Sequence, residues 1–150
     1  MMPSMSAAAQ NPVFFAYAVS TVVLSLNILV LWNMSGGVRN TVKKTLNPED
    51  AKAFGSSLVQ EEPAEIARVL RVHRNTADNS VPFLLLGAVF VALGPSALEA
   101  QIFFYGFTAI RLLYSFFYLK GIQPFRTISY GLGVLLTLGM IGDICRLLFT

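Results

Sequence analysis

Residues 13–32 read VFFAYAVSTVVLSLNILVLW, an apolar run that contains no charged side chain. A helix of about 20 apolar residues can cross the hydrocarbon core of a bilayer, which is about 30 Å thick. We therefore predict that this run forms the first membrane-spanning helix, at about 13–33. A cleavable signal peptide is the alternative, but no basic residue precedes the run and Asn33-Met34-Ser35 is a weak cleavage site.

The composition of the whole chain also indicates a membrane protein. Of its 150 residues, 55% are hydrophobic and only 13% are charged, whereas about 25% of the residues in a soluble domain are charged. The chain has one Cys and one His, too few for an intrachain disulfide or a His/Cys metal site. We expect no metal and no nucleic-acid partner.

Further apolar runs predict three more spans after a polar connection at about 35–62. The second span, 63–93, carries its charges in the first half and none within 81–93. Gly94-Pro95 ends it, and Ser96 and Glu99 have the spacing of a capping box that opens a third span at 97–119. A fourth follows at 125–148. We expect a single all-α domain over 1–150, a transmembrane four-helix bundle.

The distribution of basic residues predicts the orientation. The connection between spans one and two, the polar start of span two and the connection between spans three and four contain Arg39, Lys43, Lys44, Lys52, Arg68, Arg71, Arg74, Lys120 and Arg126. The opposite side contains only Arg146, spaced to pair with Asp143. Cytoplasmic loops carry an excess of Lys and Arg, so both connections should be cytoplasmic and both termini should lie on the other side. Within the first connection, Asn47-Pro48-Glu49-Asp50 predicts a short helical turn with Asn47 as its N-cap.

Arginines gather at the predicted cytoplasmic end of the bundle. Helical spacing places three sets on common faces: Arg71, Arg74, Asn75 and Asp78; Arg111, Tyr114 and Tyr118; and Arg126 and Tyr130. A charge near the bilayer centre costs about 2.5–3.5 kcal/mol on insertion scales, so Arg111 should have a partner or a ligand. His73 should lie off the Arg71/Asp78 face as a packing or surface residue.

These helix faces carry four arginines but only one acid, Asp78. Pairing within the bundle therefore leaves an excess of positive charge. One interpretation is that the arginines and the aspartate form ion pairs that only stabilise the bundle. The other is a polyanionic small ligand, because ionisable residues inside membranes mark functional sites and the Arg guanidinium suits carboxylates. Binding of a lipid headgroup is a form of this second reading.

Several motifs together resemble the MAPEG family, the membrane-associated proteins of eicosanoid and glutathione metabolism. They are Asn47-Pro48-Glu49-Asp50-Ala51, Arg71-Val72-His73-Arg74-Asn75, Pro82-Phe83-Leu84, Leu93-Gly94-Pro95, Arg111, Tyr118 and residues 126–130. The similarity is to the branch that contains microsomal glutathione transferase and microsomal prostaglandin E synthase.

The resemblance implies a homotrimer that binds glutathione between adjacent protomers near the cytoplasmic side. By position it implies glutathione contacts at Arg39, Arg71, Arg74, Asn75, Asp78, Arg111, Tyr118, Arg126, Thr127 and Tyr130. Asp78 replaces a Glu of the closest relatives, and its shorter carboxylate can still accept from the glutathione amine. The catalytic residues implied are Arg126, which would stabilise the thiolate, with Asp50 and Tyr130 nearby.

The expected function is a membrane-bound glutathione S-transferase that detoxifies lipophilic electrophiles entering from the bilayer, with glutathione peroxidase activity on lipid hydroperoxides as a possible addition. A prostaglandin E synthase-like isomerase is the alternative within the family. Thr127 stands where that synthase has a Ser beside the thiol, and the preceding loop is one residue shorter, which favours the transferase. A non-catalytic lipid-binding protein and a small transporter subunit remain open, although no repeat halves indicate a transporter. The expected membrane is the plasma membrane of a bacterium or the endoplasmic reticulum of a eukaryote.

Overall fold

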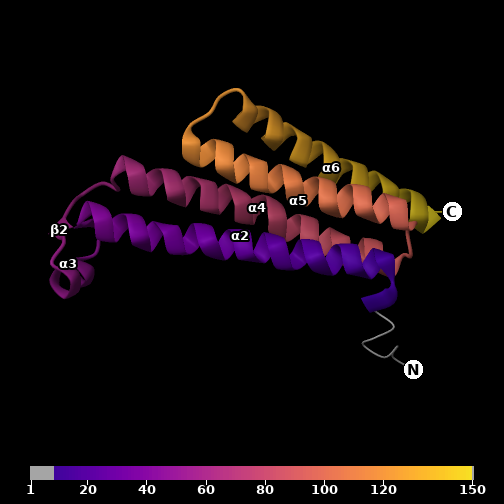
Figure 1. The fold of residues 1–150 in the computed structure, drawn as a ribbon, viewed down its shortest axis with the longest axis horizontal. Helices are drawn as coiled ribbons and strands as arrows, with labels where there is room; N and C mark the ends of the chain where they lie inside the picture. The colour runs from indigo at the N-terminus through magenta and orange to yellow at the C-terminus, as the bar shows by residue number, and fades with distance from the viewer. Residues whose placement is uncertain (1–8, 150) are drawn as a thin grey trace.

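The computed structural model describes residues 9–149, in which four long helices lie side by side (Figure 1). They are α2 (Pro12–Val42), α4 (Ala64–Ala92), α5 (Ala97–Lys120) and α6 (Phe125–Phe149). The connection from α2 to α4 contains a short helix, α3 (Pro48–Phe54), and two strands, β1 (Lys44–Thr45) and β2 (Ser57–Leu58). The α2–α4 and α5–α6 connections lie at one end of the bundle, opposite the α4–α5 turn and the C-terminal end of α6 (Figure 1).

Three of these helices, α2, α5 and α6, are long and apolar enough to cross a membrane. The helix predicted as the second of four spans, α4, is not among them. Its first half carries Arg68, Arg71 and Arg74, so only its second half is continuously apolar. The chain is an all-helical membrane protein whose α4 packs along the three apolar helices.

The ends of the helices follow some of the predicted local signals and depart from others. The Ser96 hydroxyl accepts from the Glu99 N–H at 3.3 Å and the Glu99 carboxylate accepts from the Ser96 N–H at 2.8 Å, which confirms the predicted capping box. By contrast, α2 continues past the predicted end of the first span to Val42 and stops where Lys43 takes a left-handed conformation, φ 55°. The Gly36-Gly37 pair therefore lies within the helix, which carries Arg39 in its last turn.

The predicted turn after Asn47 forms as α3, but the expected cap does not. The Asn47 side chain makes no hydrogen bond to the backbone N–H groups of the helix. Its Nδ2 instead donates to Asp50 Oδ2 at 3.0 Å. Strands β1 and β2 pair in parallel, with Lys44 opposite Ser57 and Thr45 opposite Leu58. This pairing joins the two segments that flank α3.

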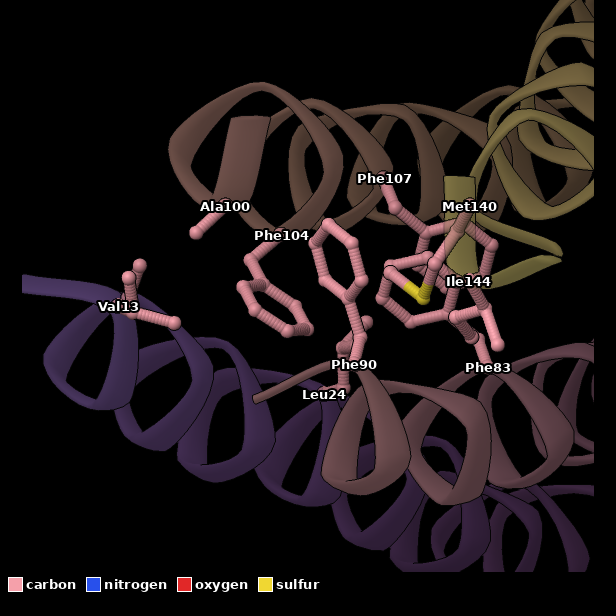
Figure 2. Close-up of a cluster of buried hydrophobic side chains, with 10 residues drawn as sticks. Val13, Leu24, Phe83, Phe90, Ala100, Phe104, Phe107, Met140 and Ile144 are labelled. Carbon is pink, nitrogen blue, oxygen red and sulfur yellow. The ribbon is translucent and has the colours of Figure 1, made fainter. Parts of the chain in front are cut away.

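Phenylalanines form the main core of the bundle (Figure 2). Phe83 and Phe90 of α4 meet Phe104 and Phe107 of α5, and all four are at most 1% exposed. The rings of Phe83 and Phe107 stack with centroids 3.6 Å apart and 4° between their planes. Packed aromatic rings bury a large apolar area, so this cluster fixes α5 against α4 beneath the polar end of the bundle.

Candidate functional site

The first group of predicted site residues lies on α4. Arg71, Arg74 and Asp78 are exposed and line an open hollow of about 530 Å³. His73, predicted to lie off the Arg71/Asp78 face as a packing or surface residue, is half-buried and also lines this hollow. Residues one apart on a helix point about 100° apart, which is close enough for side chains at the edge of one wide hollow. The result is a basic depression with a single carboxylate.

The second group lies between the C-terminal part of α5 and the start of α6. Tyr114, Tyr118, Arg126, Thr127 and Tyr130 line a hollow of about 210 Å³. The guanidinium carbon of Arg126 lies over the Tyr118 ring, 4.8 Å from its centre. The tight α5–α6 turn therefore brings together predicted site residues from two helices: Tyr118 of α5 and Arg126, Thr127 and Tyr130 of α6.

Gln123 was not predicted as a site residue and contacts two that were. Thr127 Oγ1 and the Gln123 side-chain amide lie 3.1 Å apart and share a hydrogen bond in either orientation of the amide. With the amide nitrogen donating to Thr127, the amide oxygen accepts from Arg126 Nε at 3.2 Å and from Arg126 Nη2. The spacing of three and four residues within the turn is the signal that could have identified it.

The third group lies at the end of α2 beside α3. Arg39 and Asp50 line a hollow of about 270 Å³ together with Lys44, Thr45 and other residues of the loop. Arg39 Nη2 forms an ion pair with Glu62, with the nearer carboxylate oxygen at 3.2 Å. Asp50, predicted to act near Arg126, lines a different hollow from Arg126 in the single chain.

Arg111 connects the first two groups. Its side chain is 0% exposed, and its Nη2 donates to the backbone oxygen of Asn75 at 3.1 Å and to Asn75 Oδ1 at 2.9 Å. The guanidinium carbon lies 4.3 Å from the centre of the Tyr114 ring. Arg111, predicted to need a partner or a ligand, thus has a partner within the bundle, and that partner is Asn75 on α4.

A network of small polar side chains continues from Arg111 across the bundle. Ser115 Oγ donates to the Arg111 carbonyl at 3.1 Å and accepts from Asn27 Nδ2 at 3.1 Å. Thr76 Oγ1 lies 3.3 Å from the same hydroxyl. These bonds join α2, α4 and α5 at one level, so the position of Arg111 is set by three helices.

The charge balance of the site is positive. Within residues 9–149, ion pairs to carboxylates form at Arg39 and Arg146 and at none of Arg71, Arg74, Arg111 and Arg126. Asp78, the acid on the α4 face, forms no ion pair in the described part of the chain. Exposed guanidinium groups without protein acids can bind carboxylates in a bidentate manner, and a free carboxylate can accept from an amine.

The site residues do not form one cavity in the single chain. No residue within 9–149 lines more than one of the α4 hollow, the α5–α6 hollow and the α2–α3 hollow. The residues that line them belong to the first half of α4, to the end of α2 with the following loop, and to the end of α5 with the start of α6. These segments adjoin the end of the bundle that holds the α2–α4 and α5–α6 connections (Figure 1). Each hollow is open, so a neighbouring surface could enclose it.

Comparison with known proteins gives consistent results. Residues 14–145 match the model of the MAPEG family. The chain is 33% identical to a prostaglandin E synthase of Macaca fascicularis over 135 residues, 89% of each chain. It is 34% identical to microsomal glutathione S-transferase 1 of Sus scrofa over 139 residues, 87% of this chain and 88% of the relative. The corresponding transferase of Bos taurus is 30% identical over 144 residues, 93% of each chain.

Proposed function

This chain belongs to the MAPEG family, and from that premise we propose that it is a membrane glutathione transferase acting on lipophilic electrophiles. The observation that carries the proposal is the set of arginines without acid partners at one end of the bundle. Glutathione offers two carboxylates and an amine to such a site, and the exposed Asp78 can accept from the amine.

In this reaction the thiol of glutathione loses its proton, and the thiolate attacks an electrophilic carbon. A carbon–sulfur bond forms while the bond from that carbon to the leaving group breaks, and the leaving group takes the electron pair. The thiolate is the reactive species, so a group that lowers the thiol pKa raises the rate at neutral pH. A guanidinium within a few ångströms has this effect because it favours the charged form.

We assign that role to Arg126, whose guanidinium is held between the Tyr118 ring and the Gln123 amide. Of the arginines expected to hold the carboxylates, Arg71 and Arg74 are exposed and would bind them, whereas Arg111 is buried. Arg39, which pairs with Glu62, would contact glutathione from the end of α2, and Asp78 would bind the amine. Asn75 would bond to a polar group of the tripeptide. Tyr118, Thr127 and Tyr130 would enclose the sulfur end, and Asp50 would act close to Arg126 in the assembled protein.

This assignment requires more than one copy of the chain. Among the described residues, the Arg71/Arg74 hollow and the Arg126 hollow share no lining residue, so these two hollows of a single copy do not form one pocket for both ends of glutathione. We propose that copies assemble as a homotrimer in which α4 of one protomer faces the α5–α6 turn of its neighbour. Closed cyclic assemblies of this kind place one site at each interface.

We further propose that α4 crosses the membrane as a fourth span, in company with α2, α5 and α6. Its polar half would face the shared site and its apolar half, which holds Phe83 and Phe90, would lie in the core. The excess of Lys and Arg at the end with the two connections supports the proposal that this end lies in the cytoplasm, where it would be in contact with soluble glutathione. Electrophiles would reach the sulfur from the lipid between protomers.

An isomerase acting on a prostaglandin endoperoxide is the second candidate, favoured by the similarity to prostaglandin E synthases. That activity would use a hydroxyl beside the thiol at position 127. In the amide orientation that lets Gln123 accept from Arg126, the Thr127 hydroxyl accepts from the Gln123 amide at 3.1 Å and keeps its own proton to donate, so this contact alone does not exclude the isomerase. The transferase needs no hydroxyl at this position and is therefore the primary proposal.

The test is an assay of the purified protein with glutathione and 1-chloro-2,4-dinitrobenzene, followed by the absorbance of the conjugate. A parallel assay with a lipid hydroperoxide measures oxidation of glutathione to its disulfide. Conjugate formation supports the transferase. Binding of glutathione with neither reaction would favour a non-catalytic lipid-binding protein, and absence of glutathione binding would overturn the proposal.

Arg126→Leu is the informative variant, with Lys120→Leu as a control that removes a positive charge at the same end of the bundle. Lys120 is exposed and lines none of the three hollows. If Arg126 stabilises the thiolate, turnover falls far more than glutathione affinity in Arg126→Leu and neither changes in Lys120→Leu. Equal loss of turnover and affinity in Arg126→Leu would contradict the catalytic assignment.

A further inference from the structure

Arg111 is the largest fully buried side chain in the described part of the protein. It lies at the junction of the two polar groups that the proposed function uses, yet it lines neither hollow. Its Nε and Nη1 have no hydrogen-bond acceptor and no exposed surface, and the guanidinium rests on the face of Tyr114. Among the described residues, the only hydrogen-bond acceptors of its side chain are the two oxygens of Asn75.

Two neighbouring hydrogen-bond donors determine the orientation of the Asn75 side-chain amide. Its Oδ1 lies 2.9 Å from Arg111 Nη2 and 3.5 Å from Asn79 Nδ2, and both of these nitrogens can only donate. An amide turned the other way would set its NH₂ group against two donors. The oxygen of Asn75 is therefore directed inward and occupied, whereas Nδ2 donates to no acceptor within residues 9–149.

We infer that Arg111 is a positioning residue that acts on the ligand through Asn75. It holds the Asn75 amide with its oxygen inward, so Asn75 presents only N–H donors at the site. The ligand group at this position must then be an acceptor, a carboxylate or a carbonyl oxygen. This inference rests on the proposed function and specifies which atoms of glutathione Asn75 can take.

Burial decides against direct contact between Arg111 and the ligand. The side chain has no exposed surface, and Tyr114, itself 4% exposed, covers one face of the guanidinium. On the α6 side Gly133 closes over the aliphatic part, since a Cβ there would stand 3.7 Å from Arg111 Cδ. Asn75, in contrast, is partly exposed. It does not itself line the α4 hollow, but helical spacing places it on the face of Arg71 and Asp78, which do.

A double-mutant cycle separates the two roles. Glutathione affinity is measured by calorimetry on detergent-purified wild type, Arg111→Leu, Asn75→Ala and the double variant. If Arg111 acts through Asn75, each single change lowers affinity about tenfold and the double variant loses no more than either. Losses that multiply to about a hundredfold in the double variant would mean that Arg111 binds the ligand itself, and would overturn the inference.

Asn75→Asp provides a second test that keeps the internal bond. A carboxylate at this position still accepts from Arg111 and gains charge assistance, but it offers no N–H to the ligand. The expected result is a melting temperature at or above that of wild type with glutathione affinity as weak as in Asn75→Ala. Wild-type affinity in Asn75→Asp would overturn the inference.

Thr108→Val is the matched control, one turn before Arg111 on α5. Thr108 is buried, its hydroxyl has no partner, and it contacts neither Asn75 nor Arg111 through a hydrogen bond. Its affinity for glutathione should equal that of wild type. If the wild-type protein binds no glutathione, both the proposed function and this inference fail. If the wild type binds glutathione but the losses of affinity from the two single changes multiply in the double variant, only this inference fails.

Discussion

The guanidinium carbon of Arg126 lies 4.8 Å from the centre of the Tyr118 ring, so an aromatic face of α5 supports the first basic residue of α6. A cation over an aromatic face gains about 0.5–2 kcal/mol, more where water is excluded. The ring therefore restrains the group that we propose stabilises the thiolate. Through Tyr114, 5.6 Å away between ring centres, this contact adjoins the ring that carries Arg111.

Tyr118→Leu should lower kcat for conjugation about 5- to 20-fold, because the guanidinium of Arg126 loses the face that holds it. Tyr118→Phe keeps the ring and should retain most of the activity. The measurement is kcat with 1-chloro-2,4-dinitrobenzene at saturating glutathione. Tyr105→Leu, which changes an exposed tyrosine of the same helix outside the site, is the control. Equal loss in Tyr118→Phe and Tyr118→Leu would show that the hydroxyl, and not the ring, is what matters.

The pH profile of Arg126→Leu should differ from that of wild type in a defined direction. A neighbouring guanidinium lowers a thiol pKa by about 1–3 units, so its removal moves the rise of activity with pH toward the ordinary thiol value of about 8.5. Wild type should exceed the variant by about 10- to 100-fold at pH near 6.5, and the gap should narrow above pH of about 9. A ratio that stays constant across this range would exclude an effect on thiolate formation.

The sequence was sufficient for the helical architecture and for many of the local features. The uncharged run at 13–32, the Ser96/Glu99 capping box and the i, i+3 pair of Asp143 and Arg146 are local patterns, and each has the predicted structure. The extension of α2 to Val42 was missed because Gly36-Gly37 weakens the helical signal without ending the helix. Two-residue strands such as β1 and β2 are too short to show an alternating pattern.

The site was predictable as sets of residues on helix faces and not as a cavity. Spacing placed Arg71, Arg74 and Asp78 together, and they do line one hollow. Spacing could not show that Arg111 turns to Asn75, because a contact between two helices depends on their rotation and separation. The contacts of Gln123 with Arg126 and Thr127 depend on the conformation of the tight α5–α6 turn. Their spacing in the sequence becomes informative only once that conformation is known.

Gly87→Ala tests the closeness of α4 and α5. A Cβ at Gly87 would stand 2.7 Å from Cε1 of Phe104, a ring with 0% exposure that has little room to move. Overpacking of this kind costs about 1–3 kcal/mol, so the melting temperature in detergent should fall by several degrees. At Gly106 the added Cβ meets only Leu136, at 3.6 Å, and Gly106→Ala should not lower stability. Unchanged melting of Gly87→Ala would mean that the helices separate more easily than their packing indicates.

The orientation of the protein can be read with single cysteines. Cys145 is the one cysteine of the chain, so Cys145→Ser provides a background without thiols. Ser57→Cys, exposed on β2, should react with a membrane-impermeant maleimide only after intact cells are permeabilised. Wild-type Cys145, at the opposite end of the bundle, is the reference for the other side. Labelling of Ser57→Cys in intact cells would reverse the proposed orientation.

A site shared between copies predicts recovery of activity on mixing two inactive variants. Arg126→Leu chains keep the α4 hollow, and Arg71→Leu/Arg74→Leu chains keep the α5–α6 hollow. When the two are co-expressed, about one interface in four combines an intact α4 with an intact Arg126 if copies assemble at random in a ring. Conjugation should then return to about a quarter of the wild-type rate per protomer.

The same mixing experiment distinguishes this arrangement from a site within one chain. If Arg71, Arg74 and Arg126 of a single chain held the same glutathione, no mixed assembly would contain an intact site and the activity would stay at the sum of the two variants. Mixing the purified variants in detergent after separate assembly is the control, because subunits that do not exchange cannot form mixed interfaces. Activity that recovers on co-expression but not on mixing of separately assembled variants would show that the site is shared between protomers. One protomer would supply the carboxylate-binding arginines and the next would supply the arginine that stabilises the thiolate.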